Sequence, residues 1–317
     1  MRLVSFQVAG STAIEVGVLV ADEGVVSLHQ ALPTGLLAAH EGMPEVIARW
    51  SQLQPQVQAL LNQAPHARLP EVHLLAPVPR PPKLLAIGLN YLEHVNENIV
   101  GDQGRESRSV PEHQLWFTKL GHAINGPFDD IVLPKVSERT DYEAELVAVI
   151  GQRCKHVPRE RAHEVIFGYC VGNDVSVRDW QKRTSQWTLG KSFDTHAPFG
   201  PWLTTADELN GDPHALDLRC WVNGELRQNS NTRLMIHDVC GADRAAQPGD
   251  DAGAGRRDLH GHLQRRGRGL RSAEVPAPRR CRARGDREAG RHRGALRGRG
   301  LKPQPFKPDQ TASPLRR

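Results

Sequence analysis

The chain opens with two short segments in which apolar and β-branched residues dominate. They cover residues 3–8 and 14–20 with Gly10 between them, which is the pattern of a β-hairpin. From Pro44 to Ala64, apolar residues recur at helical spacing. These elements predict a small N-terminal α+β domain over residues 1–76, followed by a stiff, proline-rich linker at residues 77–83.

From Leu84 the pattern changes to short β-rich segments separated by glycine and proline. The clearest of these cover residues 84–88, 131–134, 144–151, 166–175 and 216–222, and few helices lie between them. They predict a mixed β-sheet domain over residues 84–240, so that the chain as a whole is of the α+β class and mainly β.

The composition changes abruptly after Cys240. Residues 241–317 contain no Ile, Met, Trp or Tyr, and their 20 basic and 8 acidic residues give a net charge of +12. Residues 1–240 hold the remaining 21 basic and 28 acidic residues, a net charge of −7. Because the tail has too few apolar residues to offset its ordering entropy, it is predicted to be a disordered basic tail.

Composition also limits the compartment and the partners. The five cysteines lack the spacing of zinc sites or of a disulfide framework, and no apolar run reaches the length of a signal peptide or a membrane span. We therefore expect a cytoplasmic protein with no membrane partner. Binding of nucleic acid through the Arg/Gly tail is an alternative, which the single aromatic residue of the tail, Phe306, disfavours.

Three carboxylates lie at the ends of apolar strand segments. Glu143 and Glu145 are two residues apart at the start of one segment, so both side chains point to the same face. Asp174 follows the apolar residues 165–171, where an unpaired acid is costly. Like charges this close repel each other unless a cation binds between them, although a solvated strand edge would explain the Glu143–Glu145 pair taken alone. Without Cys or His, the set suits Mg²⁺, Mn²⁺ or Ca²⁺ rather than Zn²⁺.

Two further segments carry side chains suited to proton transfer or anion binding. His94 and Glu97 are three residues apart, on one face of a helical turn, where the carboxylate would fix the imidazole tautomer and raise its basicity. Lys191 lies in a glycine-containing apolar turn and could compensate the carboxylates or bind an anionic substrate. A surface ion pair and a surface lysine are the alternatives.

In this order, these segments resemble the fumarylacetoacetate hydrolase superfamily over about residues 80–240. The resemblance rests on GLNYLEHVNE at 88–97, DYEAEL at 141–146, NDVSVRDWQ at 173–181 and GKSFDTHAPFGPW at 190–202. It implies a catalytic domain built as a mixed β-sandwich or roll, preceded by the variable N-terminal domain of that family. It also implies a homodimer.

The resemblance further implies roles for single residues. Glu143, Glu145 and Asp174 would bind Mg²⁺ or Mn²⁺, His94 with Glu97 would activate water or move a proton, and Lys191 would steady substrate oxygens. Weaker candidates for substrate contact around the same pocket are Tyr91, Lys119, Arg178 and Gln181, of which Arg178 is also a candidate for a structural ion pair.

The function favoured by this resemblance is Mg²⁺-dependent hydrolysis of a C–C bond in a β-diketo acid such as an acylpyruvate, within aromatic catabolism. A metal-stabilised enolate would leave, and His94 with Glu97 would deliver water. The same site serves isomerases, hydratases, decarboxylases and dehydratases of 2-keto acids in this superfamily, and the sequence does not choose among them. A non-catalytic relic is a further alternative.

The basic tail lacks the strands, the Thr-Gly-Thr loop and the Pro-Gly-Asp-Val turn with which the superfamily continues. Back-translation of residues 250–267 and 272–290 with a shift of one base permits such sequences, and codon degeneracy permits others as well. We therefore hypothesise a frameshift near Cys240. It would truncate the catalytic domain, leave the activity of this particular chain open, and confine the expected homodimer to a chain with the frame restored.

Overall fold

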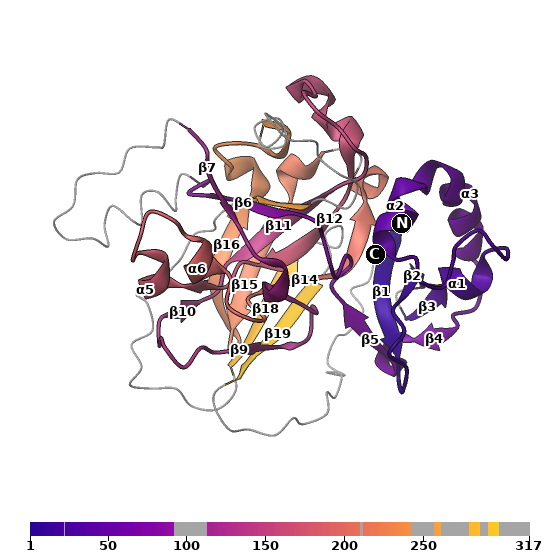
Figure 1. Ribbon diagram of the computed structural model, residues 1–317, viewed down its shortest axis with the longest axis horizontal. Coiled ribbons are helices and arrows are strands. Elements are labelled where there is room, and N and C mark those ends of the chain that lie inside the picture. The colour runs from indigo at the N-terminus through magenta and orange to yellow at the C-terminus, as the bar shows by residue number, and fades with distance from the viewer. Residues whose placement is uncertain are drawn as a thin grey trace, which may run out of the picture.

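The computed structural model describes residues 1–21, 23–91, 113–209 and 212–241, and the backbone of residues 257–260, 279–285 and 291–297. In these ranges strands predominate and the α-helices are short (Figure 1). The predicted class, α+β and mainly β, is therefore confirmed. No helix among the described residues is long and apolar enough to span a membrane.

The N-terminal part is a small antiparallel sheet covered by helices. Its strands are β1 (Arg2–Val8), β2 (Glu15–Val20), β3 (Gly24–Ser27), β4 (Ala67–Arg68) and β5 (Val72–Leu75). The predicted hairpin is β1–β2, in which Leu3 pairs with Val18. The predicted helical region is divided into α2 (Met43–Ala48) and α3 (Trp50–Leu60), and α1 (Leu28–Ala31) precedes them. Apolar residues of all three helices, among them Leu28, Val46 and Leu53, pack in one buried cluster with the strands.

The central strands continue this sheet without interruption. They are β6 (Leu84–Gly88), β7 (Leu115–Thr118), β11 (Ala144–Ile150), β12 (Ile166–Asn173) and β14 (Ala197–Thr205), with β8 (Ile124–Asn125) on one side. Strand β1 pairs with β14 through Leu3 and Leu203. With β17 (Arg257–His260) included, the order runs β4-β3-β2-β1-β14-β12-β11-β17-β6-β7. The proline-rich linker therefore separates two parts of the sequence that share one sheet.

A second sheet packs on the first. It contains β9 (Asp130–Val132), β15 (Asp217–Val222) and β16 (Glu225–Asn231), and a two-stranded ribbon is formed by β10 (Thr140–Asp141) and β13 (Ser176–Val177). Alternate residues of β11, such as Leu146 and Ala148, share a buried cluster with Leu218 of β15, whereas Val147 between them packs on the other face. This alternation follows from the two-residue period of a strand, and it makes the catalytic region a sandwich.

Short helices connect the strands. The α-helices that lie wholly within the described residues of the catalytic region are α5 (Arg178–Gln181) and α6 (Thr188–Lys191). The 3₁₀ helices are η1 (Leu69–Glu71), η2 (Gly121–Ala123), η3 (Arg159–Val165), η4 (Ala206–Leu209), η5 (Pro213–Ala215) and η6 (Thr232–Leu234).

Three strands lie in the basic tail: β17 (Arg257–His260), β18 (Arg279–Gly285) and β19 (Arg291–Arg297). Strand β17 lies between β11 and β6, β18 pairs with β15, and β19 pairs with β18 and β9. They depart from the expectation of a wholly disordered tail, because a β-ladder uses backbone groups that nearly every residue carries. The remaining residues from 242 onward lie outside the described ranges, and the frameshift stays a hypothesis because a protein structure does not test a reading frame.

Candidate metal centre

The register of β11 and β12 brings Glu143, Glu145 and Asp174 together. Ala144 pairs with Asn173, and the amide of Asp174 donates to the carbonyl of Glu143 at 2.7 Å, so Glu143 and Asp174 lie opposite each other at the end of the strand pair. The Asn173 Oδ1 atom accepts the amide of Glu143 at 3.0 Å, which holds this end in place. Glu145 lies two residues further along β11, on the face of Glu143. All three acidic residues are only 1% exposed.

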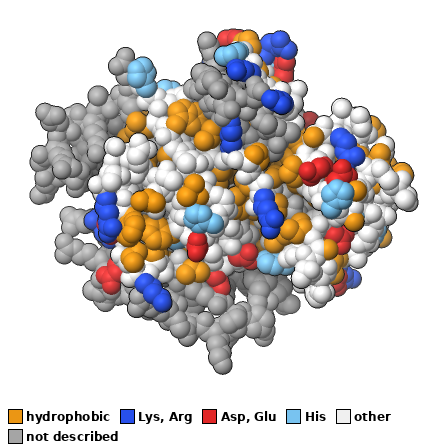
Figure 2. Space-filling view, in the orientation of Figure 1, with side chains coloured by type: hydrophobic (Ala, Val, Ile, Leu, Met, Phe, Trp, Pro, Cys, Tyr) orange, Lys and Arg blue, Asp and Glu red, His pale blue; other side chains and the backbone are white. Residues whose placement is uncertain are grey.

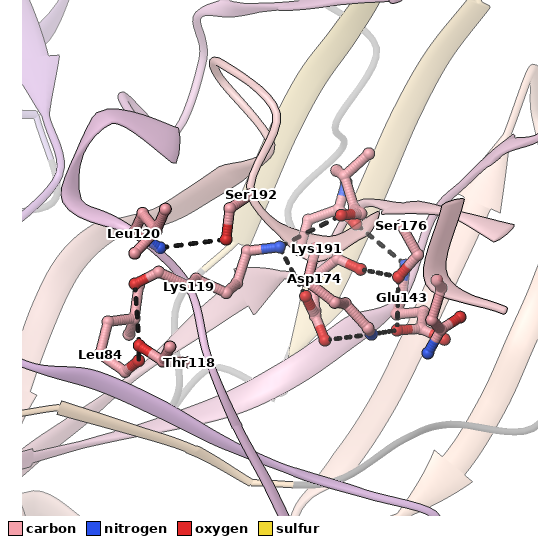
Figure 3. A network of polar contacts seen from close by, with 12 residues as sticks. Leu84, Thr118, Lys119, Leu120, Glu143, Asp174, Ser176, Lys191 and Ser192 are labelled. Carbon is pink, nitrogen blue, oxygen red and sulfur yellow. Dashed lines mark hydrogen bonds and ion pairs between the residues drawn. The ribbon is translucent and has the colours of Figure 1, made fainter. Parts of the chain in front are cut away.

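Lys191 joins two of these carboxylates, as Figure 3 shows. Its Nζ atom lies 2.6 Å from Glu143 Oε2 and 2.6 Å from Asp174 Oδ2. The residue ends α6 and is fully buried. Of the two roles that the sequence left open for Lys191, this geometry shows the first, compensation of the carboxylates.

Lys119 lies on the other oxygen of Asp174. Its Nζ atom is 2.6 Å from Asp174 Oδ1 and donates to the carbonyl of Val175 at 3.1 Å (Figure 3). Burial lowers the pKa of Lys119 to about 8, and the charge of Asp174 partly opposes this shift. The sequence suggested a substrate contact for Lys119, whereas its ammonium group is engaged in holding one orientation of the Asp174 carboxylate.

Arg178 holds Glu143 from the side of α5. Its Nη2 atom pairs with Glu143 Oε1, its Nε atom lies 2.7 Å from Asp141 Oδ2, and its Nη1 atom donates to Gln181 Oε1 at 2.8 Å. The structural ion pair suggested for Arg178 is therefore present in the structure. Gln181 supports the guanidinium group.

Two contributors were missed by reasoning from the sequence. The Ser176 hydroxyl donates to Glu143 Oε2 at 3.1 Å, and Asp141 anchors Arg178. Both flank the predicted ligands, in DYEAEL and NDVSVRDWQ, and both belong to the ribbon of β10 and β13, where Asp141 pairs with Ser176. Only the pairing of β10 with β13 shows that Asp141 and Ser176 lie side by side and support the same carboxylate, that of Glu143.

Glu145 differs from the other two acids. Both of its carboxylate oxygens are buried and have no hydrogen-bond partner among the described residues. Burial, followed by repulsion from Glu143 and Asp174, raises the pKa of Glu145 well above its ordinary value. A buried acid with nothing to satisfy its oxygens calls for a ligand in this position.

In the described residues, no group of three or more His, Cys, Asp or Glu side chains is arranged as an assembled metal site. Lys191, Lys119 and Arg178 occupy oxygens of Glu143 and Asp174. The residues still fit a hard cation, because three buried carboxylates share one strand pair and the oxygens of Glu145 are unsatisfied.

Of the remaining sequence candidates, only Tyr91 is among the described residues. Tyr91 is fully buried, and its hydroxyl has no hydrogen-bond partner among the described residues. Burial, with a contribution from the charge of Glu145, raises the pKa of Tyr91 well above its ordinary value. His94 and Glu97 lie outside the described residues, so their placement stays a prediction.

His196 is a third residue that the sequence did not reveal. It is fully buried just before β14, and its Nε2 atom donates to the carbonyl of Val132 at 3.1 Å. Burial, followed by the positive charge of Lys119, lowers the pKa of His196 to about 4. The imidazole is therefore neutral near pH 7. From the sequence alone, the single histidine within GKSFDTHAPFGPW gives no sign that it is buried and neutral.

Comparison with known proteins decides the family. Residues 83–241 match the family described as fumarylacetoacetate (FAA) hydrolase C-terminal. The chain belongs to the fumarylacetoacetate hydrolase family. Among curated family relatives, the mitochondrial oxaloacetate tautomerase FAHD2B of Bos taurus is 40% identical over 239 residues, 74% of this chain and 72% of that protein. The mitochondrial oxaloacetate tautomerase fahd2 of Xenopus laevis is 40% identical over 238 residues, 74% and 71% of the two chains.

Solved structures confirm the fumarylacetoacetate hydrolase fold. Maleylpyruvate hydrolase from Sphingobium sp. SYK-6, in complex with manganese(II) and pyruvate, is 30% identical with a TM-score of 0.72, covering 93% of this chain and 98% of its own. A 2-hydroxyhepta-2,4-diene-1,7-dioate isomerase from Mycobacterium marinum is 26% identical with a TM-score of 0.66, covering 95% and 100%. The relatives and neighbours of this fumarylacetoacetate hydrolase family chain thus include hydrolases, isomerases and tautomerases.

Proposed function

We propose that this chain is a divalent-metal-dependent enzyme that converts a small 2-keto acid through its enol or enolate form. The observation that carries the proposal is the buried group of Glu143, Glu145 and Asp174, in which Glu145 has no partner for either oxygen among the described residues. These three residues would hold Mg²⁺ or Mn²⁺. When bound, the cation would supply a Lewis acid that polarises the keto-acid oxygens.

The charges of the centre support an anionic substrate. With all four carboxylates ionised, the centre carries one net negative charge, summed over Asp141, Glu143, Glu145, Asp174, Lys119, Lys191 and Arg178. A divalent cation would turn this into one net positive charge. The metal-loaded centre would therefore attract a keto-acid carboxylate. Burial strengthens this attraction, because charges interact more strongly away from water.

The lysines and the arginine have separate parts in this proposal. Lys119 and Arg178 keep the carboxylates of Asp174 and Glu143 in place. Lys191 bridges the same two carboxylates, so a cation bound to them would free its ammonium group to bind a substrate oxygen. Such preorganised charges stabilise an enolate as its negative charge develops.

Keto–enol tautomerisation of a short keto diacid is the first reaction that we propose. The relatives that are 40% identical are named oxaloacetate tautomerases, which supports this choice. The reaction moves one proton between the carbonyl oxygen and the carbon next to the carbonyl group. It therefore needs an acid or base but no attacking water.

Hydrolysis of a C–C bond in a β-diketo acid, the reaction favoured by the sequence, is the second candidate. It is supported by the His94 and Glu97 spacing and by the similarity to a maleylpyruvate hydrolase. It adds one step, in which His94 with Glu97 would deliver water to the carbonyl.

Location and partners stay proposals. The expected cytoplasmic location contrasts with the relatives that are named as mitochondrial. A small keto acid remains the proposed partner, and a homodimer remains the proposed assembly of a chain with the frame restored. On the face drawn in Figure 2, basic and acidic side chains of the described residues are interspersed, which gives no support to nucleic-acid binding.

The proposed function is tested by replacing the unpartnered acid. Glutamine has nearly the shape of the protonated glutamate that burial favours at position 145, so we expect the Glu145→Gln variant to fold. The variant loses one charged ligand. We expect turnover with Mg²⁺ or Mn²⁺ to fall by about a hundredfold or more, and Mn²⁺ binding, measured by the spin resonance of free Mn²⁺, to weaken. The exposed Glu160→Gln variant is the matched control.

The two reactions are separated by their substrates. Loss of the enol absorbance of oxaloacetate without pyruvate release reports tautomerisation, and pyruvate release from acylpyruvates reports hydrolysis. Undiminished Mn²⁺ binding and turnover in Glu145→Gln would remove the metal assignment.

A further inference from the structure

A cavity of about 370 Å³ lies apart from the carboxylate centre. It is lined by residues of η3, η5 and η6 and by the segment that follows η6, including Arg159, His214, Arg233, Met235, Ile236 and Asp238. None of the three metal-ligand candidates lines it. Its volume falls within the range of small-molecule sites, roughly 300–1,000 Å³.

The charges that line the cavity leave one cation uncompensated. Arg159 pairs with Asp238 Oδ2, and Asp238 Oδ1 accepts the amide of Gly241 at 2.7 Å, so this pair is neutral and satisfied. In the described part of the chain, the Arg233 guanidinium makes no ion pair or hydrogen bond, although its positive charge contributes to lowering the pKa of Asp217. Arg233 is exposed and lines the cavity, so its guanidinium is available to a carboxylate or another oxyanion.

Two histidines complete the polar side. The His214 Nδ1 atom donates to Asp212 Oδ1 at 3.1 Å, while its Nε2 atom is buried and has no hydrogen-bond partner among the described residues. Burial lowers the pKa of His237, so that ring is neutral near pH 7. Because the Nε2 atom of His214 has almost no accessible surface, it offers no contact to a molecule in the cavity.

Two apolar residues, Met235 and Ile236, also line the cavity and form its apolar wall. A small inorganic ion would leave this wall without contacts. We propose that the cavity binds a small organic monocarboxylate, with its carboxylate on Arg233 and its apolar body against Met235 and Ile236. The site is separate from the metal centre and does not depend on the proposed function.

The apolar wall is tied to the motif at residues 88–97. The amide of Ile236 donates to the Asn90 carbonyl at 2.7 Å, and the amide of His237 donates to Asn90 Oδ1 at 2.8 Å. The Asn90 Nδ2 atom donates a hydrogen bond to the His237 carbonyl at 2.8 Å, and Tyr91 forms a β-bridge with Met235. A bound carboxylate therefore stabilises the contact between the wall and the segment after β6 that carries Asn90 and Tyr91.

The binding test uses benzoate and the full chain in equilibrium dialysis. We expect saturable binding whose Kd rises about tenfold or more in Arg233→Gln, because a charged hydrogen-bond donor is lost. Arg227→Gln, which alters an arginine paired with Glu225 outside the cavity, should leave Kd unchanged. Uncharged benzamide and inorganic phosphate should both bind more weakly than benzoate.

Several results would overturn the proposal. Equal benzoate binding by Arg233→Gln would remove the carboxylate site, and phosphate binding as tight as benzoate would remove the apolar wall. Glu145→Gln, which disables the metal centre, should retain benzoate binding. Loss of binding in that variant would place the anion at the metal centre instead.

Hydrogen exchange provides a second measurement. At a benzoate concentration ten times Kd, exchange of the Ile236 and His237 amides should slow by about tenfold, since opening of this contact would release the ligand. Unchanged exchange at saturation would refute the link to Asn90.

Discussion

Single residues at the candidate metal centre combine burial with opposite charge, which makes each of them sensitive to substitution. Lys119 and Asp174 are both almost fully buried, and their charged atoms are 2.6 Å apart. Removing one partner of such a pair leaves a buried charge uncompensated, which destabilises a protein by about 3–5 kcal/mol.

We therefore expect Lys119→Met to lower the free energy of unfolding of the metal-free chain by several kcal/mol, of the order of 3. Mn²⁺ should then restore more stability in this variant than in the wild type, because the cation replaces the missing positive charge. Urea unfolding with and without Mn²⁺ measures both effects, with the exposed Lys135→Met variant as the control. Equal stabilisation of both proteins by Mn²⁺ would contradict the assignment of Asp174 as a ligand.

His196 makes stability depend on pH. Its pKa of about 4 in the folded chain lies below the ordinary value of 6.5, so between these values the unfolded chain binds more protons. The contribution of His196 to stability is thus fully present above pH 6.5 and is lost as the pH falls toward 4, by about 1.4 kcal/mol per pH unit at most. His196→Gln should remove this slope. Unfolding free energies at pH 7, 6 and 5 measure it, and identical slopes in both proteins would refute it.

At the scale of elements, close packing of α5 and α6 positions Lys191. A Cβ atom on Gly190 would come within 2.3 Å of the Gln181 backbone nitrogen, which cannot move without moving α5. The glycine therefore permits an approach that brings Lys191 from α6 and Arg178 from α5 onto the same carboxylate of Glu143.

Gly190→Ala should force the two helices apart and lower the free energy of unfolding by about 1–3 kcal/mol. It should also weaken Mn²⁺ binding, because the positions of Lys191 and Arg178 around Glu143 change together. Gly121→Ala, whose added Cβ atom would meet nothing within 4 Å, is the control. A Gly190→Ala protein as stable as that control would show that the helices can separate without loss.

At the scale of the whole molecule, the N-terminal part and the catalytic region share one sheet and one core. Strand β1 pairs with β14, and Trp50 of α3 packs edge to face on Phe167 of β12 with ring centroids 5.2 Å apart. Leu3 and Leu203 lie in the same buried cluster as these helices and strands. Burial across this junction couples the stabilities of the two parts.

We expect the two parts to unfold in one transition, and Phe167→Ala to lower its free energy by about 3–5 kcal/mol without dividing it. Two methods measure the transition. Fluorescence of Trp50, in a variant that keeps it as the only tryptophan, reports on the junction, and far-ultraviolet circular dichroism reports on the secondary structure of the whole chain. Two separate midpoints in the parent chain would contradict a shared core.

Much of the candidate site could be predicted because its signals are local. Glu143 immediately precedes β11 and Glu145 lies two residues later within it, so the strand period places both on one face; Asp174 immediately follows β12, the neighbouring strand. The contacts of Lys119 with Asp174 and of Lys191 with Glu143 join residues 55 and 48 positions apart, and no local pattern reveals them. The three strands of the tail were not expected, since composition describes side chains and a β-ladder is formed by the backbone.

By itself, the sequence determined the family, the mainly β class and the acidic residues of the centre, because strand alternation and motif order are properties of neighbouring residues. Only the tertiary structure decided which cations occupy those acids, that Glu145 is left without a partner among the described residues, and that Arg233 faces a cavity. The physical reason is that the pairing and burial of a charge depend on which distant strands and helices surround it, and the fold alone brings these together.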